Sequence, residues 1–259
     1  MRVEDVAPRM RRITLGGDDL ADFASPGPTD HVKVFFPDPA TGELVTPEWV
    51  KGRPQVAEGA GELIVRDYTP LAFRAEGEHG PELDLDFVLH GDGGAGGPAA
   101  AWAANAKPGD RVRLGGPRGS QLPPTDAESA ILVADESALP AVSRWLDALG
   151  NIPAVGLFSV EDPDTASYLD AYAGEGRDFR WFSGDDREDR ITETLRGLTI
   201  DEGTFLFLAG EANSLIPRRR YLRRELGLPK NQVDIRGYWK QGTIALDHHA
   251  PLDPADPED

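Results

Sequence analysis

The sequence predicts two successive folds on one chain: a small antiparallel β-barrel or sandwich, followed by an α/β domain with a parallel sheet. The chain has 259 residues, which is enough for about two domains at roughly 150 residues per domain. Up to about residue 124, short β-rich runs alternate with turns of Gly, Pro and Asp, as in small antiparallel barrels. After Pro123-Pro124, apolar runs alternate with helix-like stretches, which indicates βαβ units and a parallel sheet.

Short runs with strand character make up the first half. They cover residues 31–36, 63–66, 83–89 and 111–114. The third of these runs begins by alternating apolar and acidic residues, which is typical of a half-solvated strand. Turns at residues 36–39 and 108–110 separate the runs, because Pro and Gly interrupt strand pairing. A helix is predicted over residues 99–106.

Continuous apolar runs dominate the second half, at residues 131–134, 154–159 and 204–209. Runs of this kind are typical of strands buried on both faces. Helices are predicted over residues 139–149, 188–198 and 214–226. Residues 251–259 are rich in Pro and acidic residues and contain no basic residue, so we expect a solvated tail. The expected domains are residues 1–124, residues 125–246 and a tail over residues 247–259.

The charge and composition exclude several classes of protein. With 27 basic and 45 acidic residues the net charge is −18, so no nucleic-acid binder is expected, since such proteins need a basic surface. No apolar run reaches the roughly 18 residues of a membrane span, and the first residues lack the plan of a secretory signal. The absence of Cys excludes disulfides, iron–sulfur clusters and thiolate metal sites. We expect a cytoplasmic protein without a metal site, because the His248-His249 pair lies in the tail.

Residues 91–96 match the pattern G-x-G-x-x-G, which binds a dinucleotide in a Rossmann fold. The preceding strand is amphipathic, and the acidic residue about 20 positions on, Asp110, lies in a turn rather than at the end of a parallel strand. A Rossmann site is therefore the weakest interpretation, and a flexible Gly-rich loop is a second. We favour a third, in which the helix that opens at Gly97-Pro98-Ala99 offers its N-terminal N–H groups to phosphate oxygens.

A series of motifs occurs in a fixed order along the chain. The most specific ones begin with Arg66-Asp67-Tyr68-Thr69-Pro70 and continue with residues 86–91, 97–103, 107–112, 116–120, 134–141, 209–212 and 237–242. With the segment at residues 9–15, the match runs from about residue 3 to residue 242. This series resembles the siderophore-interacting proteins, which are FAD-containing ferric-siderophore reductases of the ferredoxin–NADP reductase-like superfamily. The resemblance implies an N-terminal antiparallel six-stranded FAD-binding barrel, whose first strand is residues 9–15. It also implies a C-terminal parallel-sheet α/β domain that binds NAD(P)H or another electron donor.

For the cofactor, the resemblance implies a set of contacts. Arg66 would pair with the FAD pyrophosphate as a charge-assisted donor, Tyr68 would pack on the flavin, and Thr69 would lie near flavin N5 and act in catalysis. A strand-end salt bridge for Arg66 and barrel packing for Tyr68 are the structural alternatives. Trp102 would either stack on the cofactor or fill the seam between barrel and helix. The full expected set is Arg66, Asp67, Tyr68, Thr69, Asp86, Val88, His90, Gly97, Pro98, Ala99, Ala100 and Trp102.

On the donor side, polar residues follow the buried strands of the second half. Asp135, Glu136 and Ser137 end the first of these strands, and Glu211 follows the third. Since strand carboxyl ends face the ligand crevice in open α/β sheets, these residues would border the nicotinamide. Capping of the next helix explains Ser137 and Glu211 equally well.

On the substrate side, an anionic ferric siderophore needs a local positive patch on this acidic chain. Lys240 is the first candidate. Like Thr69, it is expected to act in catalysis. Further expected contacts are Lys51, Arg236, Tyr238 and Trp239. The arginines within residues 218–224 are expected to form a solvated face or to bind the 2′-phosphate of NADPH.

The leading hypothesis is therefore an FAD-dependent ferric-siderophore reductase. NADH, NADPH and reduced ferredoxin all remain possible donors, and we expect a monomer. One alternative is a flavin or quinone reductase, or an electron-transfer flavoprotein, of the same superfamily. The other is a siderophore-binding module without redox activity, which Leu71-Ala72 favours because many family members carry Arg two residues after the Thr.

Overall fold

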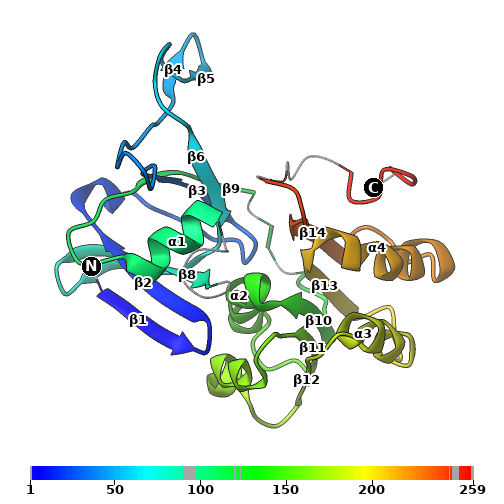
Figure 1. Cartoon of the computed structure of the whole chain (residues 1–259). Helices are drawn as coiled ribbons and strands as arrows, with labels where there is room; N and C mark the ends of the chain where they lie inside the picture. Colours follow the sequence, from blue (N-terminus) through cyan, green and yellow to red (C-terminus); the bar gives the residue numbers. More distant parts are fainter. Residues whose placement is uncertain are drawn as a thin grey trace. The chain divides into compact units, whose positions relative to one another are not determined.

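The computed structural model describes residues 2–89, 97–119, 121–122, 124–244, 246 and 251–257, without the side chain of Trp49. The chain divides into two compact units, residues 1–121 and 122–259 (Figure 1). In the described part of the chain, no helix is long and apolar enough to cross a membrane.

The first unit is built from two antiparallel sheets. The larger has the strand order β1 (Arg2–Ala7), β2 (Met10–Gly16), β8 (Gly80–Val88) and β7 (Pro70–Gly77). The smaller has the order β6 (Ile64–Tyr68), β3 (His31–Phe36) and β9 (Arg113–Arg118). The unit also contains a 3-10 turn (Asp18–Leu20), helix α1 (Gly97–Asn105) and the hairpin of β4 (Glu48–Val50) and β5 (Arg53–Gln55). The barrel-like antiparallel fold is confirmed, but its strands form sheets of four and three instead of one set of six.

Strand β8 explains how the first core forms. Leu83, Leu85 and Phe87 point into the hydrophobic cluster, while the alternate residues are acidic. The expectation of a half-solvated strand is wrong, because Asp84 and Asp86 are each only 5% exposed. Arginines of the neighbouring strands cover the acidic face and pair with its carboxylates, which offsets the cost of burying charge.

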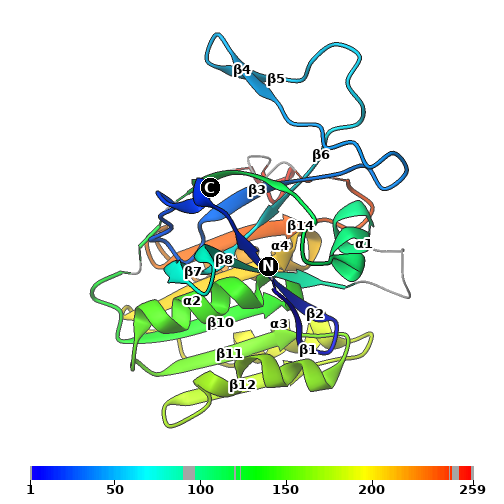
Figure 2. The same cartoon turned by 90° about the vertical axis from the view of Figure 1, so that its left-hand side faces the viewer.

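The second unit is a five-stranded parallel sheet with helices on both faces. The strand order is β12 (Arg177–Phe182), β11 (Ala154–Ser159), β10 (Ser129–Asp135), β13 (Thr204–Glu211) and β14 (Val233–Trp239). Helix α2 (Leu139–Leu149) covers one face, on which Trp145 packs against Phe205 and Phe207. Helices α3 (Arg187–Arg196) and α4 (Ala212–Arg220) cover the other (Figure 2). A 3-10 turn (Glu136–Ala138), a 3-10 helix (Pro163–Tyr172) and a π-helical turn (Tyr221–Glu225) complete the unit. The predicted parallel α/β fold is confirmed.

Two expectations about the C-terminal region hold only in part. The tail is not simply solvated, because Asp253 is 3% exposed and pairs with Arg220. Asp256 pairs with Arg224 and with Arg219. Hydrogen bonds from Arg224 and then Arg219 hold the pKa of the Asp256 carboxyl well below its ordinary value.

The arginines within residues 218–224 form a solvated face only in part. The side chains of Arg220 and Arg224 are 51% and 45% exposed. By contrast, Arg218 and Arg219 are 2% and 0% exposed. Arg218 donates to Glu188 on α3 at 2.7 Å, so its positive charge is paired within the second unit.

Candidate functional site

The cofactor motif of the first unit lies at the end of strand β6. This strand pairs with β3, so that Asp67 lies opposite Lys33 and Tyr68 lies opposite Val32. Residues opposite each other in an antiparallel pair share a face, and Lys33 Nζ accordingly donates to Asp67 at 2.9 Å. Arg66 is half-buried, and among the described residues its guanidinium has one hydrogen bond, from Nη1 to the Val65 carbonyl at 2.7 Å. The other guanidinium donors of Arg66 can therefore bind an anion.

An aromatic cluster holds Tyr68 in place. Its ring lies 4.3 Å from that of Phe87 and 6.1 Å from that of Phe36. Trp102 of α1 joins the cluster at 5.3 Å from Phe36 and 5.9 Å from Phe87. Trp102 thus fills the seam between α1 and the sheets, one of its two expected roles. Burial raises the pKa of the Tyr68 phenol, although the charge of Arg66 opposes this, so Tyr68 stays neutral at physiological pH.

The surroundings of this motif fit a polar, anionic cofactor. Thr29 and Asp30, in the loop that leads into β3, bury Oγ1 and Oδ1 without a hydrogen-bond partner in the described residues. Buried polar atoms of this kind normally have a partner, and the hydroxyl and N–H groups of a bound flavin nucleotide are suitable ones. At the start of α1, Ala99 and Ala100 are buried and small, which allows a ligand to approach the helix backbone.

The remaining expected FAD contacts differ in their surroundings. Asp86 accepts two hydrogen bonds from Arg12, both at 2.8 Å, and its side chain has no exposed surface. Val88 is half-buried at the end of β8, Gly97 and Pro98 open α1, and Thr69 lies between β6 and β7 at 8% exposure. His90 and the Gly-rich residues 91–96 lie outside the described residues.

In the second unit, the candidate donor site lies at the carboxyl edge of the parallel sheet. The strand order reverses between β10 and β13, and ligands bind at such switch points in open α/β sheets. Asp135 ends β10 at this point. Burial raises the pKa of its carboxyl, and hydrogen bonds from Ser137, Trp239 and Glu211 oppose the rise.

Four hydrogen bonds fix the Asp135 carboxylate. Oδ1 accepts from the backbone N of Ser137 at 2.9 Å and from its Oγ at 2.5 Å. Oδ2 accepts from the backbone N of Glu211 and from Trp239 Nε1, both at 2.8 Å. The backbone of Gly210 passes so close that a Cβ there would lie 2.5 Å from Oδ2. The structure therefore links Asp135 and Glu211, which were expected at the electron-donor site, to Trp239, which was expected at the siderophore site.

Glu211 and Glu136 also bind backbone groups at this edge. Glu211 caps α4 through the N–H of Ser214 at 2.8 Å and accepts from the N–H of Gln241 at 3.1 Å. Glu136 Oε1 accepts from the N–H of Glu161 at 2.8 Å, which ties the turn after β10 to the turn after β11.

The expected substrate residues lie on or directly after β14 in the second unit and at the β4–β5 hairpin in the first. Trp239 is 41% exposed at the end of β14, and Lys240, the next residue, is half-buried. Arg236 is engaged by Asp234 at 2.9 Å, and Tyr238 packs against the hydrophobic cluster under α2. Lys51 is exposed at the turn of the β4–β5 hairpin, which extends away from the sheets of the first unit (Figure 2).

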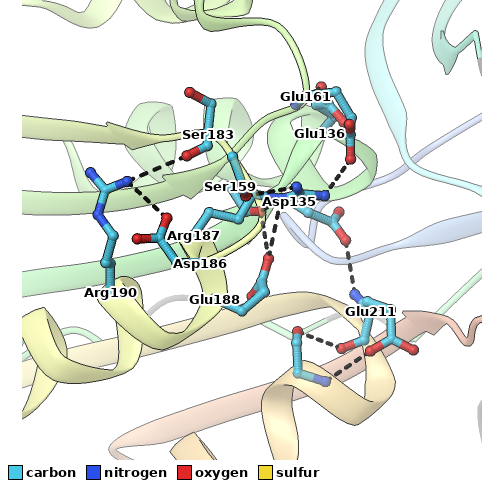
Figure 3. A network of polar contacts seen from close by, with 12 residues as sticks. Asp135, Glu136, Ser159, Glu161, Ser183, Asp186, Arg187, Glu188, Arg190 and Glu211 are labelled. Carbon is cyan, nitrogen blue, oxygen red and sulfur yellow. Dashed lines mark hydrogen bonds and ion pairs between the residues drawn. The ribbon is translucent and has the colours of Figure 1, made fainter.

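A polar network at the ends of β11 and β12 was missed by the sequence analysis. Ser159, the last residue of β11, donates to Glu188 Oε1 at 2.5 Å and accepts from Arg187 Nε at 3.1 Å. Arg187 also pairs with Glu161 (Figure 3). The sequence signal was the acidic and arginine-rich stretch over residues 183–190, but its partners lie in another turn.

The comparisons with known proteins match both units. The family model described as "Siderophore-interacting FAD-binding domain" matches residues 1–121, and the one described as "Siderophore-interacting protein" matches residues 127–242. The chain belongs to the siderophore-interacting protein family. Its first unit is thus the FAD-binding domain of the family.

Curated relatives match over nearly their whole length. The ferric vibriobactin reductase ViuB of Vibrio cholerae is 31% identical over 254 residues, which is 96% of this chain and 90% of the relative. The NADPH-dependent ferric-chelate reductase of Escherichia coli is 35% identical over 244 residues, 92% of this chain and 90% of the relative.

Solved structures agree on the fold. A siderophore utilization protein from T. fusca superimposes with a TM-score of 0.83 at 36% identity, covering 96% of this chain and 94% of the other. The siderophore-interacting protein SipS from Aeromonas hydrophila gives 0.76 at 30% identity, covering 94% and 90%. Phthalate dioxygenase reductase, at 15% identity and a TM-score of 0.61, covering 93% of this chain and 67% of the other, shares the fold.

Proposed function

We propose that the protein is an FAD-dependent ferric-siderophore reductase that releases iron inside the cell. The observation that carries this proposal is the match of both family domains, in order, to this chain. It is supported by Arg66, whose guanidinium has one hydrogen bond among the described residues and so keeps donors for an anion. The names of two relatives, a ferric vibriobactin reductase and a ferric-chelate reductase, support the same reaction.

The electron balance explains why such an enzyme needs a flavin. A nicotinamide donor gives up a hydride, which carries two electrons, and leaves as NAD(P)+. Two ferric siderophores each take one electron and become ferrous, and one proton is released to solvent. FAD, when bound, accepts electrons in a pair and passes them on singly.

The residues of the first unit would hold and orient this cofactor. Arg66 would donate to the pyrophosphate, and the helix start at Gly97 and Pro98 would add backbone N–H groups. Tyr68 would present a neutral ring whose position is fixed by Phe36 and Phe87. Thr69, at the start of the turn into β7, would place a hydroxyl or N–H near flavin N5.

The ferric siderophore would bind as a substrate, with its iron held by its own oxygen ligands. No group of three or more potential metal-binding side chains occurs in the described residues. In the second unit, Lys240 and Arg236 would supply positive charge to an anionic siderophore, and Tyr238 and Trp239 would supply apolar contact. Reduction of the iron lowers its charge and weakens its bonds to hard oxygen ligands.

A spectroscopic experiment on the full-length protein tests the proposal. NADH or NADPH is added anaerobically to the yellow protein, followed by a ferric hydroxamate or catecholate and a ferrous-specific chelator. We expect bleaching of the flavin and then formation of the ferrous chelate. A yellow protein that neither nucleotide bleaches would point to ferredoxin as donor. A chain that takes up no FAD, or one that reduces only free flavins or quinones, would contradict the proposal.

A matched pair of variants tests the cofactor site. Arg66→Met should weaken FAD binding about 10- to 100-fold, since a hydrogen bond to a charged group contributes about 1.5–3 kcal/mol. Arg113→Met is the control, because Arg113 is an exposed arginine on β9 of the same sheet. Equal FAD affinity in the two variants would remove Arg66 from the cofactor site.

A further inference from the structure

We propose that the turns after β11 and β12 select the electron donor, and that they favour NADH over NADPH. This inference rests on the proposed function and concerns the donor side of the same reaction. It depends on Glu161, which holds Arg187 and places a carboxylate at the end of β11 (Figure 3).

The sheet topology places the adenosine end of a dinucleotide at β11. The order β12-β11-β10-β13-β14 has β10 first along the chain and β11 second. In doubly wound sheets of this order, the ribose next to adenine lies at the end of the second strand. An acidic residue there binds the 2′-hydroxyl of NADH, whereas an available arginine accommodates the 2′-phosphate of NADPH.

Arg187 contacts Ser159 at this position, and each of its three nitrogens already donates one hydrogen bond, so three of its five N–H donors are engaged. Nε donates to Ser159 Oγ at 3.1 Å, Nη1 donates to the Gly184 carbonyl at 3.0 Å, and Nη2 donates to Glu161. A phosphate bound to the two remaining N–H donors would lie next to the Glu161 carboxylate, which already neutralises this guanidinium. The Glu161 side chain is 45% exposed, so a ribose hydroxyl can reach it.

The hydroxyl of Ser159 also donates its hydrogen bond within the protein. It donates to Glu188 Oε1 at 2.5 Å, and Glu188 Oε2 accepts from the buried Arg218 at 2.7 Å. Glu188 also pairs with the buried Arg218, so its carboxylate stays beside Ser159 and keeps the hydrogen bond from the Ser159 hydroxyl. A 2′-phosphate would lie beside this second carboxylate and gain no donor from Ser159.

The wider surroundings are strongly negative. Residues 159–164 and 183–190 contain seven acidic and two basic side chains. Apart from Arg187, the basic residue is Arg190, which pairs with Asp186 and donates to the Ser183 carbonyl at 3.3 Å. A phosphate dianion would therefore enter a region of like charge, while an uncharged 2′-hydroxyl pays no such cost.

The test compares both nucleotides on the FAD-loaded, full-length protein with ferricyanide as acceptor. We expect kcat/KM for NADH to exceed that for NADPH by about tenfold, the size expected from two or three partly exposed like-charge contacts. Higher ionic strength should reduce this ratio, because exposed charges are screened. Equal use of the two nucleotides, or a preference for NADPH, would overturn the inference.

Variants separate selectivity from folding. Glu161→Gln removes one negative charge and leaves Arg187 only a neutral acceptor in its place, so kcat/KM for NADPH should rise several-fold while that for NADH does not rise. Asp185→Asn, at an exposed position, should raise NADPH use by a smaller factor. Asp178→Asn is the control, because Asp178 forms a similar exposed pair with Arg180 near the start of β12. A parallel change for both nucleotides in Glu161→Gln would indicate a purely structural role.

A separate arm distinguishes this inference from the proposed function. The holoenzyme is reduced with dithionite and then mixed with a ferric siderophore. Iron reduction here, without bleaching by either nucleotide, would uphold the reductase and overturn the donor assignment. Rapid bleaching by NADH without iron reduction would uphold the donor assignment and contradict the reductase.

Discussion

Replacing Asp135 by Asn should destabilise the second unit and loosen the indole of Trp239. The carboxylate accepts two hydrogen bonds on each oxygen, but an amide has one oxygen and one NH2 group. With the NH2 group toward Ser137, the Ser137 hydroxyl can turn and accept from it, so the bond that is lost is the one from the Ser137 N–H. Loss of one bond to a charged acceptor costs about 1.5–3 kcal/mol, and relief from burying the charge returns part of this, so we expect a net loss of about 1–2 kcal/mol.

Urea unfolding of Asp135→Asn, Trp239→Phe and the double variant gives the measurement. Phe keeps an aromatic ring but removes the indole N–H, so the cycle measures what the negative charge of Asp135 adds to its bond with Trp239. We expect a coupling of about 1–2 kcal/mol, within the range for contacting residues. Asp135→Asn within about 0.5 kcal/mol of the wild type, which is typical of an uninvolved surface site, would refute the account of this edge.

Three further variants test other parts of the fold. Gly210→Ala should cost about 1–3 kcal/mol in urea unfolding, because the residue has φ of 141° and its Cβ would meet Asp135. Arg12→Ala should cost about 3–5 kcal/mol, because it removes two hydrogen bonds and the paired charge from the buried Asp86 carboxylate, and joint replacement of both residues by Leu should recover most of that loss. Asp256→Asn should lower the melting temperature at neutral pH. Since the folded-state pKa of this carboxyl lies below its unfolded value, its contribution is complete above the unfolded pKa of about 4 and is lost as pH falls through the folded pKa. The melting curves of wild type and variant should therefore converge in acid.

The elements that the sequence located best are those buried on both sides. Residues 154–159 and 139–149 coincide with β11 and α2, because a central parallel strand needs a continuous apolar run and its covering helix needs a wide apolar face. The strand at residues 9–15, which came from the resemblance, is β2 displaced by one residue.

The edge strands were missed for a physical reason. Strand β12 reads Arg177–Phe182 with charged residues at alternate positions, and β14 is half-exposed along most of its length. A strand at the edge of a sheet buries less surface, so its sequence carries no continuous apolar run. Arg236, Tyr238 and Trp239 could be assigned to the site only through the resemblance, and their strand became evident from the structure.

The contacts of the site are the least accessible to sequence reasoning. Trp239 and Asp135 are 104 positions apart, and neither residue type signals the other. The same holds for Arg218 and Glu188, whose pairing turns an apparently solvated arginine into a buried one. Charge patterns in a sequence show how many ions are present, but their pairing depends on the fold.

The distribution of paired and unpaired charge would allow a protein of net charge −18 to discriminate among anionic ligands, as the proposed donor preference requires. In the first unit, Arg12 and Arg74 cover the acidic face of β8, so that face contributes little field. In the turns after β11 and β12 the acidic side chains outnumber the basic ones, and their field extends into the solvent through which a nucleotide approaches. Moving a carboxylate from the second region to the first would leave the net charge unchanged but would weaken the expected exclusion of a 2′-phosphate. Donor preference should therefore follow the local charge at Glu161 rather than the total charge of the chain.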